Sequence, residues 1–471
     1  MALYTISHAF FGGEATNLDG QSPAPCGINP EDLRDEIFDY IFLHKPLPAS
    51  FSTPIATATL DDLRREFEYW YPMDLRVSAK DLIPNHLTMC LYNHSEIWKD
   101  QPQMWPRGMY CNGHIMVDAE KMSKSKGNFL MLLECVEEFT ADATRFALAD
   151  AGDTLEDANF DRSVANQAIT YLFNEEEWIR QVLGDVEKGV MRDGEEALCF
   201  MDRAFNNEMD HLIEATLSDF NRMNFRDGIH RAWFDMIIVR DFYRDWSIRC
   251  NIPMHKTVTL RFIEALTVMM APITPHWCEM VWELMGRTGT VCDARWPAFQ
   301  ACDKNIRKEY IFFRDFLKNF RLGSIKLKVA SPKCAYVYLA STYEPMKVEV
   351  LQYMQTQCDA NGKFAATFVK DMKPWIESQP HLKPATKVLM QFAAFMRDEA
   401  EERGADALAT VLPINQRAIL EENKAYLMAA LELAEVSFHD VDGEGEVPGD
   451  KKKSAQAAPS KPSFSLYSAN K

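Results

Sequence analysis

The sequence lacks the patterns that mark disulfide-stapled, zinc-binding and membrane-embedded proteins. Its eleven cysteines are scattered, with no CxxC pair and no Cys/His cluster at zinc spacing. Because their number is odd and the chain is long, we expect free thiols in a reducing compartment, and therefore a cytoplasmic location. No run reaches about 18 uncharged apolar residues, so we expect no membrane span. No basic segment precedes an apolar run near Met1, so we expect no signal peptide.

The chain also lacks the excess of basic residues that coats many nucleic-acid-binding proteins, because its formal net charge is −18. An acidic whole does not exclude a nucleic-acid partner, since binding depends on local basic patches. The apolar fraction of 47% and the charged fraction of 25% are ordinary for a soluble globular protein. A chain of 471 residues is long enough for roughly two to four domains.

Residues 1–160 are typical of an α/β domain. A helix is expected from Asn29 through Ile41, with Asn as its cap, Pro at the first helical position and acids in the first turn. A second helix is expected over Leu60–Glu68. Met109–Val117 is a short apolar, strand-like run, and a loop rich in Lys, Ser and Gly follows it. Strands that alternate with helices indicate an α/β layer.

Residues 161–330 change to long helices. Apolar residues recur there at close to four-residue spacing in two stripes: Phe225, Ile229, Trp233 and Ile237, and Val258, Phe262, Leu266 and Met269. Such stripes predict the buried seams of an all-helical bundle rather than a cofactor site. Thr274 and Pro275 predict the cap and the first residue of a further helix.

Residues 331–440 are expected to form a small α/β unit. A strand is expected over Cys334–Ala340, helices near 344–357, 384–403 and 415–433, and a final strand over Val436–His439. Gly404 stands just past the end of the second helix, where a left-handed cap is favoured. Residues 441–471 are rich in Gly, Pro, Ser, Ala and Lys, so we expect a linker or a disordered tail there.

The residues expected to carry chemistry lie in the loop after Met109–Val117, where residues 121–125 read Lys-Met-Ser-Lys-Ser. The ammonium groups of Lys121 and Lys124 can both reach a polyphosphate, because lysine is a compact charge on a flexible stem. Serine hydroxyls and backbone N–H groups add donors to the same anion. Gly127 lets the chain turn without a side chain in the way. Taken alone, such a run is also typical of a solvated basic loop or a kinase target site.

This run is the KMSKS motif of the class I aminoacyl-tRNA synthetases, and its flanks resemble those of leucyl-tRNA synthetases of the eukaryotic and archaeal type. The flanks read WYPMDLRVSAKDL at 70–82, NHL at 85–87, NGH at 112–114, FALADAGDT at 146–154 and EDANF at 156–160. Valyl, isoleucyl and methionyl enzymes share the loop but not this set of flanks. The resemblance extends over residues 1–440.

The resemblance implies a leucine–tRNA ligase, in which leucine and ATP form leucyl-adenylate and the leucyl group then moves to tRNA(Leu). It implies that residues 1–160 are the C-terminal half of a Rossmann-type catalytic domain and that residues 161–330 are an anticodon-binding-type helix bundle. Mg²⁺ is expected to be held mainly by the ATP phosphates, with no metal site built from the protein.

The resemblance also implies roles for individual residues. The expected catalytic residues are Lys124 and Lys121, and the expected ligands of ATP, adenylate or leucine are Met122, Ser123, Ser125, Gly113, His114, Asp81 and His86. Taken alone, Asp81 is equally typical of a surface carboxylate, and His86 of a hydrogen-bonded histidine in a protein core.

The sequence departs from the family pattern in three ways. Ala79 stands where the family usually has Gly, which would matter if that backbone needed a positive φ. None of the eleven histidines lies in a HIGH-type motif, the second phosphate-binding motif of class I enzymes. The editing domain, which the family inserts before this region, is also missing. We therefore expect a fragment of the family's full length.

Three alternatives stay open. The chain could be an inactive tRNA-binding or scaffolding module, or one half of a split synthetase whose N-terminal half is separately encoded. It could also belong to another class of nucleotidyl transferase that shares the loop. A multi-synthetase assembly is a further candidate partner.

The stretch 303–328 is the best candidate for contact with tRNA phosphates, since it holds eight Lys or Arg and three Asp or Glu. Its interleaved aromatics are more typical of a helix core than of base-stacking platforms. Arg240 and Arg244 share a helix face, and ion pairs with Asp241 and Asp245 on the same helix are their expected role.

Overall fold

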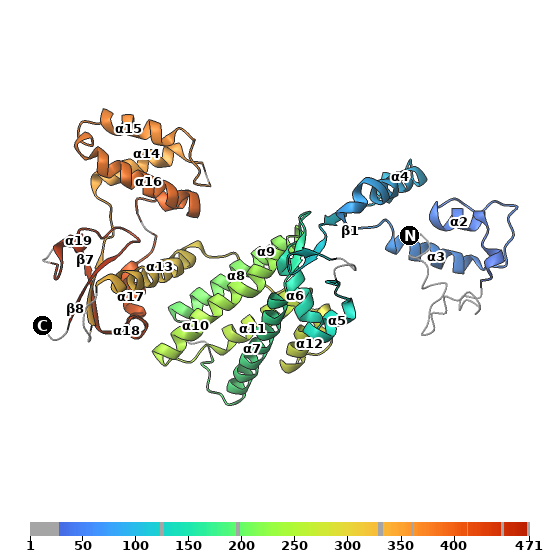
Figure 1. Ribbon diagram of the computed structural model, residues 1–471, viewed down its shortest axis with the longest axis horizontal. Coiled ribbons are helices and arrows are strands. Elements are labelled where there is room, and N and C mark those ends of the chain that lie inside the picture. Colours follow the sequence, from blue (N-terminus) through green and yellow to red (C-terminus); the bar gives the residue numbers. More distant parts are fainter. Residues whose placement is uncertain are drawn as a thin grey trace. The chain divides into compact units, whose positions relative to one another are not determined.

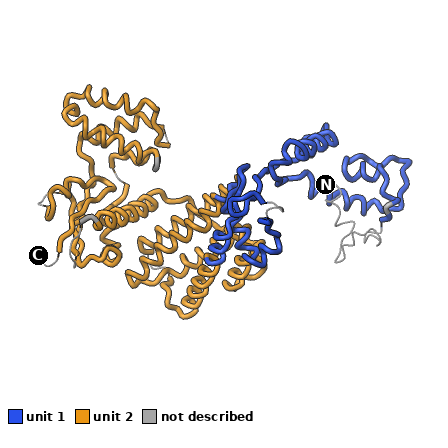
Figure 2. The backbone as a smooth tube through the Cα atoms, viewed as in Figure 1, with its two compact units in different colours: residues 1–170, 223–226 blue, residues 171–222, 227–471 orange. Residues whose placement is uncertain are grey.

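The computed structural model describes residues 28–122, 127–194, 198–327, 333–359, 361–411, 413–443 and 447–468. The chain forms two compact units (Figure 2). Unit 1 comprises residues 1–170 and 223–226, and unit 2 comprises residues 171–222 and 227–471. Within the described ranges, no helix is long and apolar enough to cross a membrane.

Unit 1 combines short helices with short strands (Figure 1). Its helices are α2 (Asp35–Phe42), α3 (Thr57–Trp70), α4 (Thr88–Ile97), α5 (Leu132–Phe139), α6 (Ala141–Ala151) and the start of α7 (Arg162–Glu187). Its strands are β1 (Arg76–Ala79), β2 (Met109–Asn112), β3 (Ile115–Val117), β4 (Glu120–Lys121) and β5 (Ala158–Phe160).

These strands make two small sheets rather than one continuous layer. Strands β1 and β2 pair in parallel, with Arg76 opposite Met109 and Ala79 opposite Asn112. In the second sheet β3 lies in the middle, parallel to β5 and antiparallel to β4. The apolar run Met109–Val117 therefore forms two strands, because Gly113 and His114 separate them.

The first helix of unit 1 begins later than the sequence predicted. Residues Pro30–Asp32 form only a 3₁₀ turn, and α2 starts at Asp35. The side-chain amide of Asn29 donates to the Asp32 carboxylate (3.2 Å). Arg34 is held extended, because its guanidinium donates to the Ser52 carbonyl and lies 4.2 Å from the Phe51 ring centre. This tertiary contact interrupts the expected helix. The second expected helix is confirmed as α3.

Unit 2 begins with a bundle of long helices. After α7 come α8 (Phe200–Asn221), α9 (Phe225–Ile229), whose first two residues belong to unit 1, α10 (Met236–Cys250), α11 (Lys256–Met270), α12 (Pro275–Leu284) and α13 (Lys304–Leu327). The stripe on α11 is confirmed, because its four apolar side chains are at most 5% exposed. The other stripe is interrupted, since His230–Asp235 forms a π-helical turn between α9 and α10. Helix α12 starts at Pro275 as predicted, but Thr274 makes no side-chain cap.

A small α/β region completes unit 2. It contains β6 (Lys333–Leu339), α14 (Pro345–Gln357), α15 (Phe368–Ser378), α16 (Thr386–Arg403), α17 (Gln416–Glu422), α18 (Lys424–Leu431), β7 (Leu433–Asp440), α19 (Lys451–Ser454) and β8 (Ser463–Ser468). Strand β6 lies in the middle of the sheet, parallel to β7 and antiparallel to β8. Gly404 follows α16 at a positive φ of +85°, but its ψ of 173° is extended, so it does not form the expected left-handed cap.

Helix α15 was not predicted, and the helix expected over 415–433 is divided in two at Asn423. That side chain is buried, donates to the Ile419 carbonyl (2.8 Å) and accepts from Trp246 Nε1 (2.9 Å). The Asn423 side chain thus bonds both to α17 and to α10, and these two hydrogen bonds hold the chain at the point where the helix is divided.

Residues 441–471 were expected to be a linker or a disordered tail, and β8 corrects this expectation. Its first four residues, Ser-Phe-Ser-Leu, alternate polar and apolar side chains, which is the period of a strand. The Phe464 ring stacks on Phe320 of α13 with centroids 4.0 Å apart, and Tyr467 stacks on Tyr336 of β6 at 4.5 Å. Two well-placed aromatics thus order a segment whose overall composition suggested disorder.

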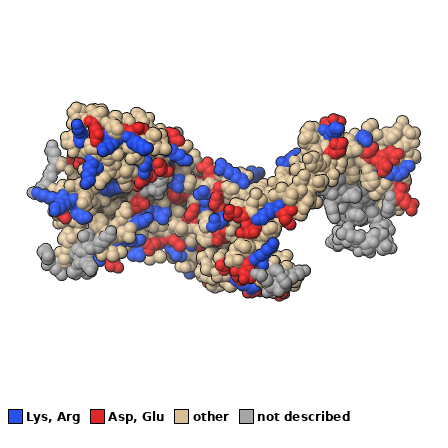
Figure 3. Space-filling view, turned by 45° about the horizontal axis from the view of Figure 1, so that its top comes forward, with Lys and Arg blue, Asp and Glu red and all other residues tan. Residues whose placement is uncertain are grey.

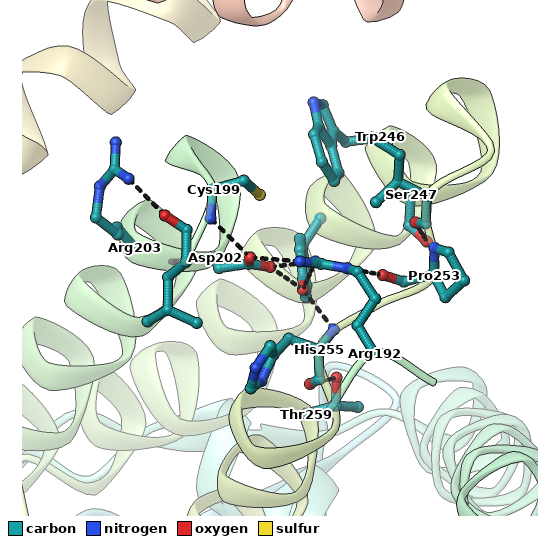
Figure 4. A network of polar contacts seen from close by, with 12 residues as sticks. Arg192, Cys199, Asp202, Arg203, Trp246, Ser247, Pro253, His255 and Thr259 are labelled. Atoms are coloured by element: carbon teal, nitrogen blue, oxygen red, sulfur yellow. Dashed lines mark hydrogen bonds and ion pairs between the residues drawn. The ribbon is translucent and has the colours of Figure 1, made fainter. Parts of the chain in front are cut away.

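A buried polar network fixes the start of α8 (Figure 4). The Asp202 carboxylate has no exposed surface and accepts from Arg192 (2.6 and 2.9 Å), from the Cys199 backbone (3.0 Å) and from the Tyr243 hydroxyl. Burial alone would raise the pKa of Asp202, but the hydrogen bonds from Arg192, Tyr243 and Cys199 lower it below its usual value. The network joins α8, α10 and the segment before α8.

We expect Asp202→Asn to destabilise the chain by about 3–5 kcal/mol, because it removes the buried carboxylate that pairs with the half-buried Arg192 guanidinium. The depressed pKa makes this contribution complete above the unfolded-state pKa, and it is lost as the pH falls through the folded-state pKa. Urea unfolding at several pH values measures both effects. The control is Asp193→Asn, which removes an exposed ion pair with Lys256 and should change little. Equal destabilisation by the two variants would contradict the prediction.

Candidate functional site

The candidate site lies at the carboxyl ends of the parallel strands β1 and β2. Lys80 and Asp81 follow β1 in a 3₁₀ turn, and Gly113 and His114 follow β2 directly. Because Ala79 lies opposite Asn112, these two short segments leave the sheet side by side. In α/β proteins the carboxyl ends of parallel strands are the usual place for ligands.

Asp157, which immediately precedes β5, joins the two segments. One of its carboxylate oxygens accepts from Lys80 Nζ (2.6 Å) and from the His114 backbone N–H (2.9 Å). The same oxygen lies 3.4 Å from His114 Nδ1, and Asp81 Oδ1 lies 3.9 Å from His114 Nε2. The Lys80 ammonium, with help from the His114 N–H, lowers the pKa of Asp157 to about 2. Asp157 is therefore a carboxylate at any physiological pH.

Gly113 is required by packing in this structure. A Cβ atom at this position would lie 2.0 Å from the Glu156 carbonyl oxygen, which is backbone and has no freedom to move away. The Gly113 N–H donates to the Thr154 carbonyl (2.9 Å). The close approach of residues 112–114 to residues 154–157 thus depends on the absence of a side chain.

The structure brings Asp81 and His114 together but places His86 elsewhere. His86 lies in the π-helical turn Ile83–Leu87, where its Nε2 is 2.8 Å from the Arg76 guanidinium. Its side chain is exposed, so it is not a core histidine either. Asp81 is also exposed, at 59% of its side-chain surface, which leaves it accessible to a ligand.

Only the ends of the loop at 121–127 lie within the described residues. Lys121 is exposed and pairs from β4 with Met116 of β3. Met116 stands two residues after His114 in the chain. The Asn128 amide donates to the Lys121 carbonyl (3.2 Å), and Gly127 takes a positive φ of +70°. Met122 is half-buried, whereas Ser123, Lys124 and Ser125 lie outside the described residues. The loop therefore starts and ends close to the His114 segment.

Two participants in this cluster, Lys80 and Asp157, were not predicted as site residues. Both occur in the flanks that carry the family resemblance, but they are 77 residues apart, and no local pattern connects them. The departure at Ala79 has no backbone consequence, because its φ of −76° and ψ of 152° are ordinary extended values. Among the described residues, no group of three His, Cys, Asp or Glu side chains is arranged to hold a metal ion.

The second candidate surface is helix α13. Its aromatics are core, as expected, because Tyr310, Phe312, Phe313, Phe316 and Phe320 are at most 4% exposed. Arg314, Lys318 and Arg321 are exposed and recur at four- and three-residue spacing, which places them along one stripe of the helix. The side chain of Lys326 and all of Lys328 lie outside the described residues. Acidic and basic side chains are otherwise mixed over the visible face (Figure 3).

Two family descriptions match the chain. "tRNA synthetases class I (M)" matches residues 52–176, and "Anticodon-binding domain of tRNA ligase" matches residues 202–321. The first includes the cluster around Asp157 and the loop at 121–125. The second includes α8 to α12 and most of α13.

Individual relatives agree with these matches. The cytoplasmic leucine–tRNA ligase of Pongo abelii is 36% identical over 93% of this chain, that of Dictyostelium discoideum 34% over 98%, and that of Saccharomyces cerevisiae 36% over 88%. These matches cover only 37%, 43% and 37% of the relatives. The chain thus spans about two fifths of their length, and over that stretch it is similar to cytoplasmic leucine–tRNA ligases and matches a class I tRNA synthetase family.

Proposed function

We propose that the chain supplies the KMSKS side of the catalytic site and the tRNA-binding helices of a cytoplasmic leucine–tRNA ligase. The observation that carries this proposal is the convergence of Asp81, Gly113 and His114 at the ends of β1 and β2. Lys121, at the base of the KMSKS loop, pairs from β4 with Met116 of β3, which stands two residues after His114. We further propose that residues 1–160 belong to a Rossmann-type catalytic domain, residues 161–330 to a tRNA-binding bundle, and residues 331–440 to an accessory α/β unit.

In this proposal the leucine carboxylate attacks the α-phosphorus of ATP and pyrophosphate leaves, so no side chain needs to act as a nucleophile. Lys121 and Lys124, with Ser123 and Ser125, bind the β,γ-phosphates. Their charges stabilise the negative charge that develops on the leaving group, which is how they accelerate the step. The leucyl group then moves to the terminal adenosine of tRNA(Leu).

The residues at the strand ends position the other substrate groups. The Gly113–His114 segment and Asp81 face the adenosine and leucine parts of the adenylate, while Met122 packs at the base of the loop. His86, held by Arg76, contributes from the neighbouring turn. Asp157 is already engaged by Lys80 and His114, so we assign it to positioning and not to metal binding. Mg²⁺, held mainly by the ATP phosphates, would neutralise charge on the departing pyrophosphate.

A specific observation favours a role in which the chain supplies one part of a catalytic domain, and a further part covers it, over that of a scaffolding module. Helix α4 buries none of its residues, and Met89 and Tyr92 on it are 57% and 67% exposed. Val77 of β1 is 62% exposed, although parallel sheets are normally covered on both faces. A polypeptide with a further parallel strand and helix would cover this surface.

The 471-residue chain by itself should show little leucine-dependent exchange between ATP and pyrophosphate, because its sequence holds no HIGH-type motif. Adding a polypeptide that carries the HIGH-type part of a leucine–tRNA ligase should restore exchange. The measurement is incorporation of labelled pyrophosphate into ATP. Exchange by the chain alone at the rate of a full-length relative would contradict the two-part interpretation.

In the reconstituted enzyme, Lys124→Ala should slow adenylate formation much more than it weakens leucine binding. Each charge-assisted contact to a phosphate is worth roughly 1.5–3 kcal/mol. That range corresponds to about 10–150-fold in rate when the contact forms mainly in the transition state. Lys124→Arg should restore only part of the rate, because a planar guanidinium does not replace a point charge.

Single-turnover kinetics separates adenylate formation from transfer, and Lys99→Ala is the control, since Lys99 is an exposed lysine that does not belong to the loop. Pyrophosphate has left before transfer, so transfer from preformed adenylate should change less than activation. A collapse of transfer with normal activation would reassign Lys124 to contact with the tRNA end.

Binding of tRNA by this chain should depend strongly on salt through the basic residues of the stretch 303–328. Replacing Lys318, Arg321, Lys326 and Lys328 with Gln should reduce the slope of log affinity against log salt by about 1 for each phosphate that the variant no longer binds. A matched control neutralises four exposed lysines of the α14–α16 region: Lys363, Lys370, Lys373 and Lys387. Filter binding at several salt concentrations measures both slopes, and a larger change in the control would move the tRNA-binding surface to that region.

A further inference from the structure

A pocket of about 260 Å³ opens on the helix bundle of unit 2, between α7 and the segment that runs from the π-helical turn into α10. The proposed function assigns it no role. Its volume lies below the roughly 300–1,000 Å³ of sites for drug-sized molecules, so it suits a single ring system.

The floor of the pocket is a buried ion pair. Both oxygens of Glu175 accept from the Arg240 guanidinium at 2.8 Å, and the two side chains are 5% and 4% exposed. This pairing corrects the expectation that Arg240 would serve mainly its own helix. Apolar residues of similar volume would often be equally stable in such a position, so a buried ion pair beside a pocket calls for a functional explanation.

The pair continues outward as an alternating chain of charges. Arg240 Nε donates to Asp241 Oδ1 (2.9 Å), and the same oxygen lies 3.1 Å from the Arg244 guanidinium. Arg244 lines the pocket, and its side chain is 42% exposed. Because Glu175 and Asp241 balance Arg240 and Arg244, the pocket has no net charge, but it presents a guanidinium to solvent at its mouth.

The remaining walls are aromatic and held in place. Arg240 stacks on Trp178, 4.0 Å from the ring centre. Trp233 packs edge-on against Trp277 (5.5 Å), whose Nε1 donates to the Leu172 carbonyl (3.0 Å). Tyr171 packs edge-on against Phe234 at 5.8 Å and is 37% exposed. The π-helical turn carries Trp233 into this wall, and such turns recur at functional sites.

We propose that this pocket binds one unstacked nucleotide, with the base stacked on the exposed ring of Tyr171, bounded by the buried Trp178 and Trp233, and with the phosphate on Arg244. Unpaired bases stack on aromatic side chains and on guanidinium planes, and both line this pocket. Arg244 at the mouth offers a guanidinium, the side chain best suited to bind a phosphate through paired hydrogen bonds. Only the expectation that the nucleotide belongs to a tRNA rests on the proposed function.

The test uses the full chain and two probes, uridine monophosphate and hexauridylate. Neither contains adenine, so neither uses the adenosine contacts of the proposed ATP site, and the two separate a free nucleotide from an RNA strand. Equilibrium dialysis gives the affinities. Tyr171→Ala should weaken binding about 10-fold because it removes a stacking surface, and Arg244→Gln should also weaken it.

Arg249→Gln is the matched control. Arg249 lies on the same helix, is 39% exposed and pairs with Asp245 much as Arg244 pairs with Asp241, but it does not line the pocket. Unchanged affinity in this control, with weaker binding in the two pocket variants, supports the proposal. Absence of binding of either probe to the wild-type chain would overturn it, as would an equal decrease in Arg249→Gln.

The probes also separate this inference from the proposed function. Tighter binding of hexauridylate than of the monophosphate supports an RNA strand as the ligand, whereas equal affinities support a free nucleotide in the same pocket. The variant neutralised on α13 should lose salt dependence for tRNA while it binds uridine monophosphate normally. Loss of monophosphate binding in that variant would count against the pocket, whatever the tRNA result.

Discussion

The Asp157 carboxylate holds the candidate site together, because it joins the segments that follow β1 and β2 to the segment that precedes β5. Lys80 donates to this carboxylate and to the Leu155 carbonyl (3.1 Å), so one ammonium holds two points of the same segment. The approach is possible because Gly113 has no side chain to meet the backbone at Glu156. The orientation of His114, and its distance from Asp81, follow from this arrangement. All of these groups are partly exposed, so the importance of Asp157 lies in position rather than in a large gain in stability.

Unit 2 uses buried charges in a different way. Asp202 and the Glu175–Arg240 pair are almost fully enclosed, and each joins elements that are far apart in the sequence. A buried ion pair adds little net stability compared with apolar residues, but removal of one partner is strongly destabilising. We infer that such pairs specify which faces of α7, α8 and α10 meet, while the apolar stripes supply most of the stabilisation. The pocket above Glu175 and Arg240 lies at one of these points.

The features that the sequence predicted best were those that depend on local periodicity. The stripe on α11, helix α3 and the starts of α12 and α14 were predicted to within a few residues, because apolar spacing and the position of Pro restrict the backbone locally. The interruption at Arg34, the break at Asn423 and the ordering of β8 were missed. Each depends on a partner distant in the sequence: Ser52 for Arg34, Trp246 for Asn423 and Phe320 for Phe464.

The same division applies to the candidate site. The sequence alone determined which functional groups are present: the ammonium and hydroxyl groups of residues 121–125, and the flanks that carry the resemblance to leucyl-tRNA synthetases. Only the tertiary structure decided that His114 meets Asp81 and Asp157, that His86 turns to Arg76, and that Lys80 belongs to the cluster. The physical reason is that the type of a side chain determines which bonds it can make. Its partner, in contrast, depends on which ends of strands lie side by side in the sheet. Residues 77 apart in the chain share no local pattern from which that meeting could be predicted.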